Sequence, residues 1–337
     1  MKTVIPENYK NLLSIYDTQK AISLLKRLFE DRLGALLNLH RVSAPLFVDE
    51  SSGLNDNLNG HERPVSFDIL RSEHRAEVVQ SLAKWKRLAL KRYGFYPGKG
   101  IYTDMNAIRR DEDELDNIHS VYVDQWDWEK VILPENRNVD YLKLTVMDIV
   151  TAICDTQDTM QAIYPQLQSL GKLERRVSFV TSQELENLYP DFSSKEREYR
   201  YVKEHKTAFI IGIGGALASG KPHDGRAPDY DDWSLNGDII FYNELLDCAF
   251  EISSMGIRVS PETLDMQLRL SGHDERRELP YHKSLLNDEL PLTIGGGIGQ
   301  SRLSMLLLGK IHIGEVQASI WDEKTIKLCE EAGIILL

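Results

Sequence analysis

The segment SVYVDQWDWEKVI, residues 120–132, combines the residues of a buried strand with polar side chains that suit a small charged ligand. Because successive strand side chains point to opposite faces, Gln125, Asp127 and Glu129 share one face, and the two tryptophans lie on the other. A buried amide or carboxylate is costly without a partner. The pattern predicts either a strand end that emerges into solvent or a pocket for a small polar ligand.

A second group of polar residues could hold a metal ion. The segment LNGDIIFYNELLDCAFEISSMGIR predicts a hairpin with its turn near residues 243–246, which places Asp238 roughly opposite Glu251 or the next residue. Alternation puts Glu251 and Ser253 on one face. Two carboxylates repel unless a cation lies between them, and oxygen ligands suit Mg²⁺ bound together with substrate phosphates. The alternative is a carboxylate neutralised by an arginine such as Arg258.

Two glycine-rich segments resemble phosphate-binding motifs only in part. GGALASGKP, residues 214–222, ends in Pro222, which has no hydroxyl for Mg²⁺, so a strand end followed by a turn explains it better. GGGIGQ fails the dinucleotide pattern at Gln300, and no βαβ unit follows. We expect a glycine turn that allows close backbone approach to a ligand and leads Arg302 into a helix. That arginine would stack on an aromatic base, or else lie plainly on the surface.

The elements that must position these residues are helices around a run of strands. Runs of strands between flanking helices favour an α+β fold with a mainly antiparallel sheet over alternating βαβ units. Capping boxes at Thr181 with Glu184 and at Ser193 with Glu196 predict two helix starts. Further helices are expected at 18–39, 81–93 and 139–169, a polar loop at 51–60, and strands at 40–48 (interrupted by Pro45), in two stretches of 101–129 joined by a charged loop, and at 207–215, 235–243 and 247–255.

Composition limits the class of protein. The 337 residues carry a formal charge of −12, which opposes broad nucleic-acid binding, and 42% hydrophobic content is ordinary for a globular chain. The three cysteines are scattered, without the spacing of a zinc site or a disulfide framework. No signal layout opens the chain, and the most apolar stretch is about half the length of a membrane span. We expect a soluble, cytoplasmic protein.

Taken together, several segments resemble one known family. GGGIGQSRL resembles the third signature of class II aminoacyl-tRNA synthetase folds, YTDMNAIRRDED the second, and the helix at 18–39 with Pro45 the first, which builds a dimer interface. SLAKWKR, HSVYVDQWDWE, RAPDYDDW, LNGDI, FEISSMGIRV and TIGGGIGQSRL are similar to the ammonia-dependent asparagine synthetases, the aspartate–ammonia ligases, over nearly the whole chain. The resemblance implies one catalytic domain over residues 1–337, a homodimer, and neither a nucleic-acid partner nor a membrane partner.

The family reaction joins L-aspartate, ATP and ammonia into L-asparagine, AMP and pyrophosphate through a β-aspartyl-adenylate, with ATP as substrate and Mg²⁺ as cofactor. A carboxylate nucleophile is already ionised at neutral pH, so the reaction needs charge neutralisation and in-line positioning. A glutamine-dependent enzyme would need a cysteine nucleophile near its N-terminus. None of the three cysteines lies there, so we expect ammonia to be the nitrogen donor.

The resemblance also implies roles for individual residues. Arg109 would hold the α-phosphate and the β-carboxylate, although Arg110 stands where the family pattern has proline, so either arginine is a candidate. Asp127 would meet the substrate ammonium and Gln125 its carboxylates, while Asp56 or Asp231 would bind ammonium or help remove its proton. The implied catalytic residues are Arg109, Lys86, Gln125 and Asp56; the substrate-binding residues are Asp127, Ser81, Asp231, Arg226 and Ser254; the nucleotide-binding residues are Arg302, Gly297, Arg258 and Ser253; and the Mg²⁺ ligands are Glu251 and Asp238.

Two other hypotheses come from different classes. The basic segment KWKRLALKRYG would suit an RNA-binding synthetase, but such a run is also typical of a solvated helix face, and no segment resembles an anticodon-binding domain. A catalytically silent sensor of aspartate or asparagine would be expected to have lost Arg109, Arg302 or a metal carboxylate. All of these residues are present.

Overall fold

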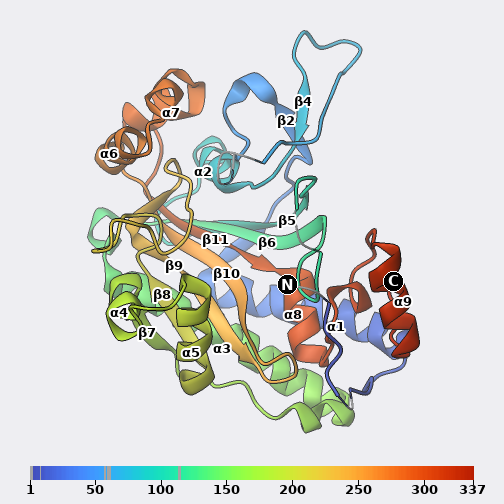
Figure 1. The fold of residues 1–337 in the computed structure, drawn as a ribbon. Coiled ribbons are helices and arrows are strands. Elements are labelled where there is room, and N and C mark those ends of the chain that lie inside the picture. Colours follow the sequence, from blue (N-terminus) through green and yellow to red (C-terminus); the bar gives the residue numbers. More distant parts are fainter. Residues whose placement is uncertain (1–2, 8, 57, 59–61, 113–114) are drawn as a thin grey trace.

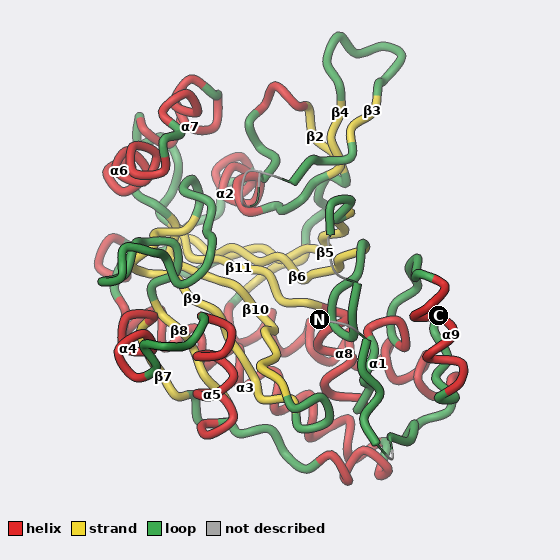
Figure 2. The backbone as a smooth tube through the Cα atoms, viewed as in Figure 1, coloured by secondary structure: helices red, strands yellow, loops and turns green. Residues whose placement is uncertain are grey.

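The centre of the fold is a large, mainly antiparallel sheet (Figures 1 and 2). The computed structural model describes residues 3–7, 9–56, 58, 62–112 and 115–337, and within these the sheet has eight strands in the order β1-β5-β6-β11-β10-β9-β8-β7. Only the outermost pairs, β1–β5 and β7–β8, are parallel. The strands are β1 (Leu39–Arg41), β5 (Gly100–Ile108), β6 (Tyr122–Val131), β7 (Ser178–Thr181), β8 (Thr207–Ile211), β9 (Asp231–Asn243), β10 (Cys248–Arg258) and β11 (Thr293–Gly299). The predicted α+β class is confirmed.

Helices cover both faces of this sheet. On one face α1, α3 and α8 pack into the main hydrophobic core, where Phe29 of α1 meets Trp126 of β6 with ring centroids 4.7 Å apart. On the other face α4 and α5 cover the β7–β10 half, and α2 lies on β5, β6 and β11. The helices are α1 (Ile15–Leu37), α2 (Ala83–Arg92), α3 (Val139–Ile163), α4 (Ser182–Leu188), α5 (Ser194–His205), α6 (Pro261–Ser271), α7 (Pro280–Leu286), α8 (Gln300–Leu308) and α9 (Glu323–Glu331).

A second, three-stranded sheet projects from this body, at the top of Figure 1. Among the described residues it contains β2 (Phe47–Asp49), β4 (Ala76–Val78) and β3 (Ser66–Phe67), in that order. The predicted polar loop at 51–60 lies between β2 and β3, and its residues 57, 59 and 60 fall outside the described part. Its residue Asp56 lies within the described part and is buried.

Most predicted helices and strands are found, with shifted ends. The helix expected over 139–169 ends at Ile163 and continues as a 3₁₀ turn from Pro165, because proline cannot continue the α-helical hydrogen bonds. The box at Thr181 and Glu184 is reciprocal; at the start of α5, Ser193 accepts the hydrogen bond from the Glu196 amide. No helix of the described chain combines the length and the apolarity that crossing a bilayer requires.

Two details of the sheet correct the sequence-based expectations. The β9–β10 hairpin closes with Asn243 opposite Cys248, and a β-bulge lies between Glu251 and Ser253, so Asp238 pairs with Ser254 rather than with Glu251 or its neighbour. An extra bulged residue shifts the register, which simple alternation does not foresee. The glycine run at 295–299 is not a turn either: it is the strand β11, paired with β6 and β10 on its two sides.

Candidate active site

The predicted site residues gather on the sheet face opposite α1, α3 and α8. A cavity of about 220 Å³ lies over β6, β11 and β10, and a second opens beside it around the start of α8. The first is lined by twelve of the fifteen predicted residues: Asp56, Ser81, Lys86, Arg109, Gln125, Asp127, Arg226, Asp231, Glu251, Ser254, Arg258 and Gly297. Arg302 lines the second cavity, which shares Gln125, Glu251 and Gly297 with the first.

Strand β6 forms one side of this cavity and resolves the ambiguity of its sequence. Gln125 and Asp127 line the cavity, whereas Trp126 and Trp128 are fully buried on the opposite face, against α1, α3 and α8. Asp127 is itself only 3% exposed, so the segment does not end in bulk solvent. The structure therefore places these side chains in a cavity and not at a strand end in solvent.

Strand β11 forms a floor with little side-chain bulk. A Cβ atom at Gly297 would lie 2.8 Å from Oδ1 of Asp127 and closer still to the amide of Gln125, and one at Gly295 would collide with the carboxylate of Glu129. Because these glycines have no side chains, the polar side chains of β6 can extend across the neighbouring strand. The glycines thus make room for protein side chains as well as for a ligand.

Helix α2 places a buried ammonium beside these carboxylates. Lys86 Nζ lies 3.0 Å from the carbonyl oxygen of Gly296, 3.1 Å from Oδ2 of Asp127 and 4.0 Å from Oε2 of Glu129. Burial lowers the pKa of Lys86, and the two carboxylates act in the opposite direction. The amide of Leu82 also donates to Asp127, at 3.3 Å. Asp127 is therefore held by two donors from the start of α2.

The basic residues of α2 point largely inward. Lys84 lies 3.5 Å from the buried carboxylate of Asp229, and Arg87 donates to the carbonyls of Val259 and Pro291 at 2.7 and 2.9 Å. Lys86, described above, is buried as well. Three of the charges that suggested an RNA-binding helix are thus buried and held by partners inside the protein.

A buried ion pair forms the wall at the far end of β6. Arg258 donates to Glu129 at 2.8–3.1 Å and also to Asp231, while Thr293 donates to Glu129 at 2.7 Å. Burial would raise the pKa of Glu129, but Arg258, Lys86 and the Thr293 hydroxyl hold it below its ordinary value. The pKa of Arg258 lies above its usual range because these carboxylates outweigh its burial.

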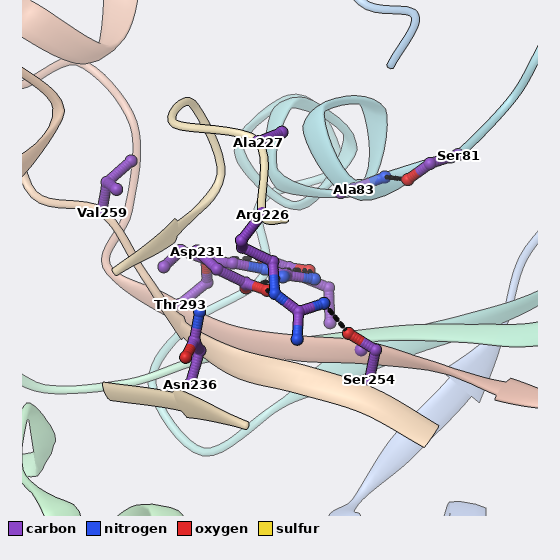
Figure 3. Close-up of polar contacts among 12 residues, drawn as sticks. Ser81, Ala83, Arg226, Ala227, Asp231, Asn236, Ser254, Val259 and Thr293 are labelled. Atoms are coloured by element: carbon purple, nitrogen blue, oxygen red, sulfur yellow. Dashed lines mark hydrogen bonds and ion pairs between the residues drawn. The ribbon is translucent and has the colours of Figure 1, made fainter. Parts of the chain in front are cut away.

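Arg226, on the loop before β9, crosses the cavity to β10 (Figure 3). Its guanidinium donates to Ser254, and it forms an ion pair with Asp238 at 2.6 Å. Its Nε lies 4.0 Å from Oδ2 of Asp231. The arginine that neutralises Asp238 is therefore Arg226, whereas Arg258 pairs with Glu129 and Asp231.

The carboxylates predicted to hold a metal share a face but have different surroundings. Burial raises the pKa of Asp238, Arg226 opposes this rise, and the charge of Glu251 adds to it. Glu251 lines the cavity, with 39% of its side chain exposed, and its Oε1 lies 4.0 Å from Arg302. The described residues contain no group of three or more acidic, histidine or cysteine side chains arranged for a metal. Glu251 and Asp238 fit Mg²⁺ only as a site completed by substrate oxygens.

Arg109 differs from the other cations of the site in that it forms no ion pair with the described residues. It follows β5, where its amide donates to the Val121 carbonyl at 2.7 Å, and its side chain lines both cavities. Its Nη1 is buried and has no hydrogen-bond partner in the described part of the chain. Arg110 is exposed and lines only a more open cavity beside the first. The geometry favours Arg109 as the residue that meets an anionic ligand.

Asp56 and Ser81 approach from the side of the small sheet. Asp56 Oδ1 accepts a hydrogen bond from the Leu58 amide at 3.0 Å, and the Gln80 side chain donates to the Asp56 carbonyl. Burial raises the pKa of Asp56, and Lys84 opposes this rise. Ser81 Oγ accepts from the amide of Ala83 at 3.1 Å, at the start of α2 (Figure 3).

Two predicted residues, Ser253 and Asp238, line neither of these two cavities, and two other residues near the site, Glu129 and Tyr230, were not predicted. Ser253 lies opposite Ile239 and Ile298 on the core side, because the bulge breaks the alternation from Glu251. Asp238 is buried and paired with Arg226. Glu129 shared the face of Gln125 in the strand pattern, but the pattern gave it no role, because its partner Arg258 is 129 residues away in the sequence. Tyr230 lines the cavity, and burial with nearby Asp56 and Asp231 raises its pKa; no spacing signal marked it.

The comparisons with known proteins agree on one family. A family model described as aspartate-ammonia ligase matches residues 16–333. Proteins named aspartate–ammonia ligase from Clostridium perfringens strain 13 and Lactobacillus acidophilus are 60% and 58% identical, over 100% of this chain and 99% and 100% of theirs.

Solved structures share the fold at low identity. Asparaginyl-tRNA synthetase from Pyrococcus horikoshii, complexed with asparaginyl-adenylate, aligns with a TM-score of 0.66 and 15% identity over 91% of this chain and 70% of its own. Asparaginyl-tRNA synthetase from Entamoeba histolytica, also in complex with asparaginyl-adenylate, aligns with a TM-score of 0.66 and 14% identity. The alignment covers 90% of this chain and 66% of that one. The chain has the catalytic-core fold of class II aminoacyl-tRNA synthetases and belongs to the aspartate–ammonia ligase family.

Proposed function

We propose that this protein joins ammonia to the β-carboxylate of L-aspartate, using ATP and releasing AMP and pyrophosphate through a β-aspartyl-adenylate. The observation that carries the proposal is the cavity itself, which Gln125, Asp127 and Arg109 line together, with Nη1 of Arg109 buried and without a hydrogen-bond partner in the described part of the chain. Such a site offers a carboxylate for the substrate ammonium and a cation for its carboxylate and for a phosphate. Family membership supports the same reaction.

Each group has a defined part in this reaction. Asp127 and Gln125 bind the aspartate, with Lys86 setting the position of the Asp127 carboxylate. Arg109 brings the β-carboxylate and the α-phosphate together and neutralises the charge that grows on the phosphate. Arg302 lies against the adenine, where its planar guanidinium can stack. Gly297 leaves the floor open to the ligand.

The magnesium site is the least complete part of the protein's own structure. Glu251 and Asp238 would hold the ion, which supplies charge neutralisation on the phosphates. Asp238 is already paired with Arg226, so Glu251 is the better-placed carboxylate. Arg226 and Ser254 form the neighbouring wall for substrate oxygens.

The ammonium ion must lose a proton before it attacks. Asp231 already accepts a hydrogen bond from Arg258, whereas Asp56 receives only a backbone amide at Oδ1 among the described contacts. Burial raises the pKa of Asp56, so its carboxylate accepts a proton more readily than an ordinary aspartate, which favours it as the group that takes this proton.

The proposal includes a homodimer of single-domain subunits in the cytoplasm. Relatives in the family match this chain over 99% and 100% of their own length, which supports a single catalytic domain. Light scattering after size exclusion tests the dimer: a mass of twice 38.6 kDa supports it, and a mass of 38.6 kDa refutes it.

One incubation tests the reaction. The protein is mixed with aspartate, ammonium chloride, ATP and Mg²⁺, and the nucleotides and amino acids are separated by chromatography. Asparagine and AMP in equal amounts support the proposal, whereas asparagine with ADP would overturn the adenylate route. Aspartate-dependent pyrophosphate exchange without asparagine would favour a synthetase-like protein, and salt-sensitive tRNA binding would strengthen that alternative. Equal use of glutamine and ammonium would refute ammonia as the donor.

A further inference from the structure

Helix α8, which carries Arg302, has no capping side chain of its own. Its N-cap position is Gly299, and no side chain there accepts a hydrogen bond from the first turn. A Cβ atom at Gly299 would lie 3.1 Å from the Cβ of Arg302 and 3.5 Å from its Cδ. The close packing of Arg302 on this glycine therefore disfavours the serine, threonine or aspartate that usually caps a helix.

The neighbouring strand β6 supplies the missing acceptor. Oδ1 of Asp124 accepts a hydrogen bond from the Ser301 amide at 3.0 Å. The side chain of Gln317 braces both residues, because its Nε2 lies 3.4 Å from the same Oδ1 and 3.1 Å from Ser301 Oγ. A buried carboxylate at a helix N-terminus satisfies a free amide and interacts favourably with the helix dipole. Asp124 thus caps α8 from another element.

Both oxygens of Asp124 are engaged by protein donors. Lys26 of α1 lies 3.4 Å from Oδ2, and the Ser301 amide with Gln317 occupies Oδ1. Asp124 borders the same cavity as Arg302, yet it has no oxygen free of a protein donor for a ligand. Any effect of Asp124 on the ligand is therefore expected to pass through the helix that it holds.

We propose that Asp124 is a positioning residue for the nucleotide: it fixes the first turn of α8 and thereby the guanidinium of Arg302. The inference rests on the proposed contact between Arg302 and the adenine. Two further contacts hold the same turn, from Gln300 to Asp104 at 2.8 Å and from Arg302 to the Glu251 carbonyl at 3.0 Å. The first turn of α8 and the Arg302 side chain are thus held by contacts to β5, β6 and β10. Asp124 of β6 provides the contact in which a carboxylate accepts from the helix backbone.

A double-mutant cycle on nucleotide binding tests this inference. ATP affinity is measured by calorimetry without aspartate, and the KM values for ATP and aspartate are measured in turnover, for Asp124→Ala, Arg302→Ala and the double variant. Losing the cap is expected to weaken ATP binding about fivefold and to leave the KM for aspartate unchanged. In the Arg302→Ala protein, Asp124→Ala should add little, because its effect passes through Arg302. Additive losses, or equal losses for both substrates, would overturn the inference.

Two more variants serve as controls. Lys26→Met removes the other partner of Asp124 but leaves the cap, so ATP affinity should stay within about twofold of wild type. Asp124→Asn keeps an acceptor oxygen and should bind ATP better than Asp124→Ala; it replaces the alanine variant in the cycle if that protein does not fold. Asparagine formation with wild-type ATP affinity in the Asp124 variants would refute this inference alone. Failure of the wild type to make asparagine while it binds ATP would refute the proposed function alone, and failure to bind ATP would refute both.

Discussion

Replacing Arg109 with methionine is expected to abolish most activity without weakening the fold. Its guanidinium lines both cavities, and its Nη1 has no partner in the described part of the protein. Negative charge on the α-phosphate grows as the aspartate carboxylate attacks, so the arginine interacts more strongly with the transition state than with the bound substrates. Losing one such preorganised donor costs about 10²–10³ in kcat, or about 3–4 kcal/mol.

The same substitution has an unusual expected effect on stability. Removing a buried polar group normally breaks a hydrogen bond, but Nη1 of Arg109 makes none to the described residues. A buried donor without a partner carries a desolvation cost of about 1–3 kcal/mol, which methionine would relieve while keeping much of the apolar contact. The free energy of unfolding, measured with urea, should therefore be unchanged or raised by about 1 kcal/mol.

Arg110→Met provides the matched control, since its side chain is exposed one residue further along the chain. AMP release in the presence of aspartate and ammonium should stay within about twofold of wild type for this variant. Near-normal turnover by Arg109→Met together with a large loss in Arg110→Met would transfer the phosphate role to Arg110. A loss of several kcal/mol of stability in Arg109→Met would show that the residue supports the fold, and the argument from its unpaired Nη1 would fail.

Three further substitutions test the other charged groups. Asp127→Asn should raise the KM for aspartate about tenfold or more while ATP affinity is kept, because it removes one charge-assisted contact; equal losses for both ligands would indicate a structural role. Glu251→Gln should raise the Mg²⁺ concentration needed for half-maximal rate several-fold, whereas Glu112→Gln, at the same cavity, should not; indistinguishable Mg²⁺ curves would remove Glu251 as a ligand. Glu129 has a lowered pKa in the folded protein, so the folded state binds fewer protons at this group than the unfolded chain does. Its contribution to the free energy of unfolding is therefore present above the ordinary glutamate pKa of about 4.3 and is lost as the pH falls below that value. The free energy of unfolding, measured with urea from pH 6 to pH 3, should accordingly fall less steeply for Glu129→Gln than for wild type. Parallel curves for the two proteins would contradict this expectation.

The sequence predicted the wall of the site better than its internal contacts. Alternation in β6 correctly separated Gln125 and Asp127 from the tryptophans, because a strand fixed by large apolar residues leaves only one register. The sequence could not show that Lys86 would reach Asp127, because the segment KWKRLALKR has the composition of a solvated helix face. The identity of a salt-bridge partner depends on tertiary packing between distant segments, which local patterns do not encode.

The hairpin shows where the pattern itself misled. Alternation placed Ser253 beside Glu251, but the bulge moves Ser253 to the core and Ser254 to the cavity. A bulge adds one residue to one strand and leaves no distinctive composition, so only the paired strand shows it. The glycine run was likewise mistaken for a turn, because glycine is usually scarce inside strands. In β11 it is required by the neighbouring side chains that cross it.

The position of β11 has a consequence for how the protein is made. This strand lies near the C-terminus of the chain yet sits in the middle of the sheet, between β6 and β10. Until a ribosome has released residues 293–299, β1-β5-β6 and β10-β9-β8-β7 are two separate half-sheets, each with an open edge. Open edges favour aggregation, and the floor of the cavity does not yet exist. Every nascent chain is therefore inactive and exposed until its last segment is inserted, and a chain cut before residue 293 should depend on chaperones and never acquire activity.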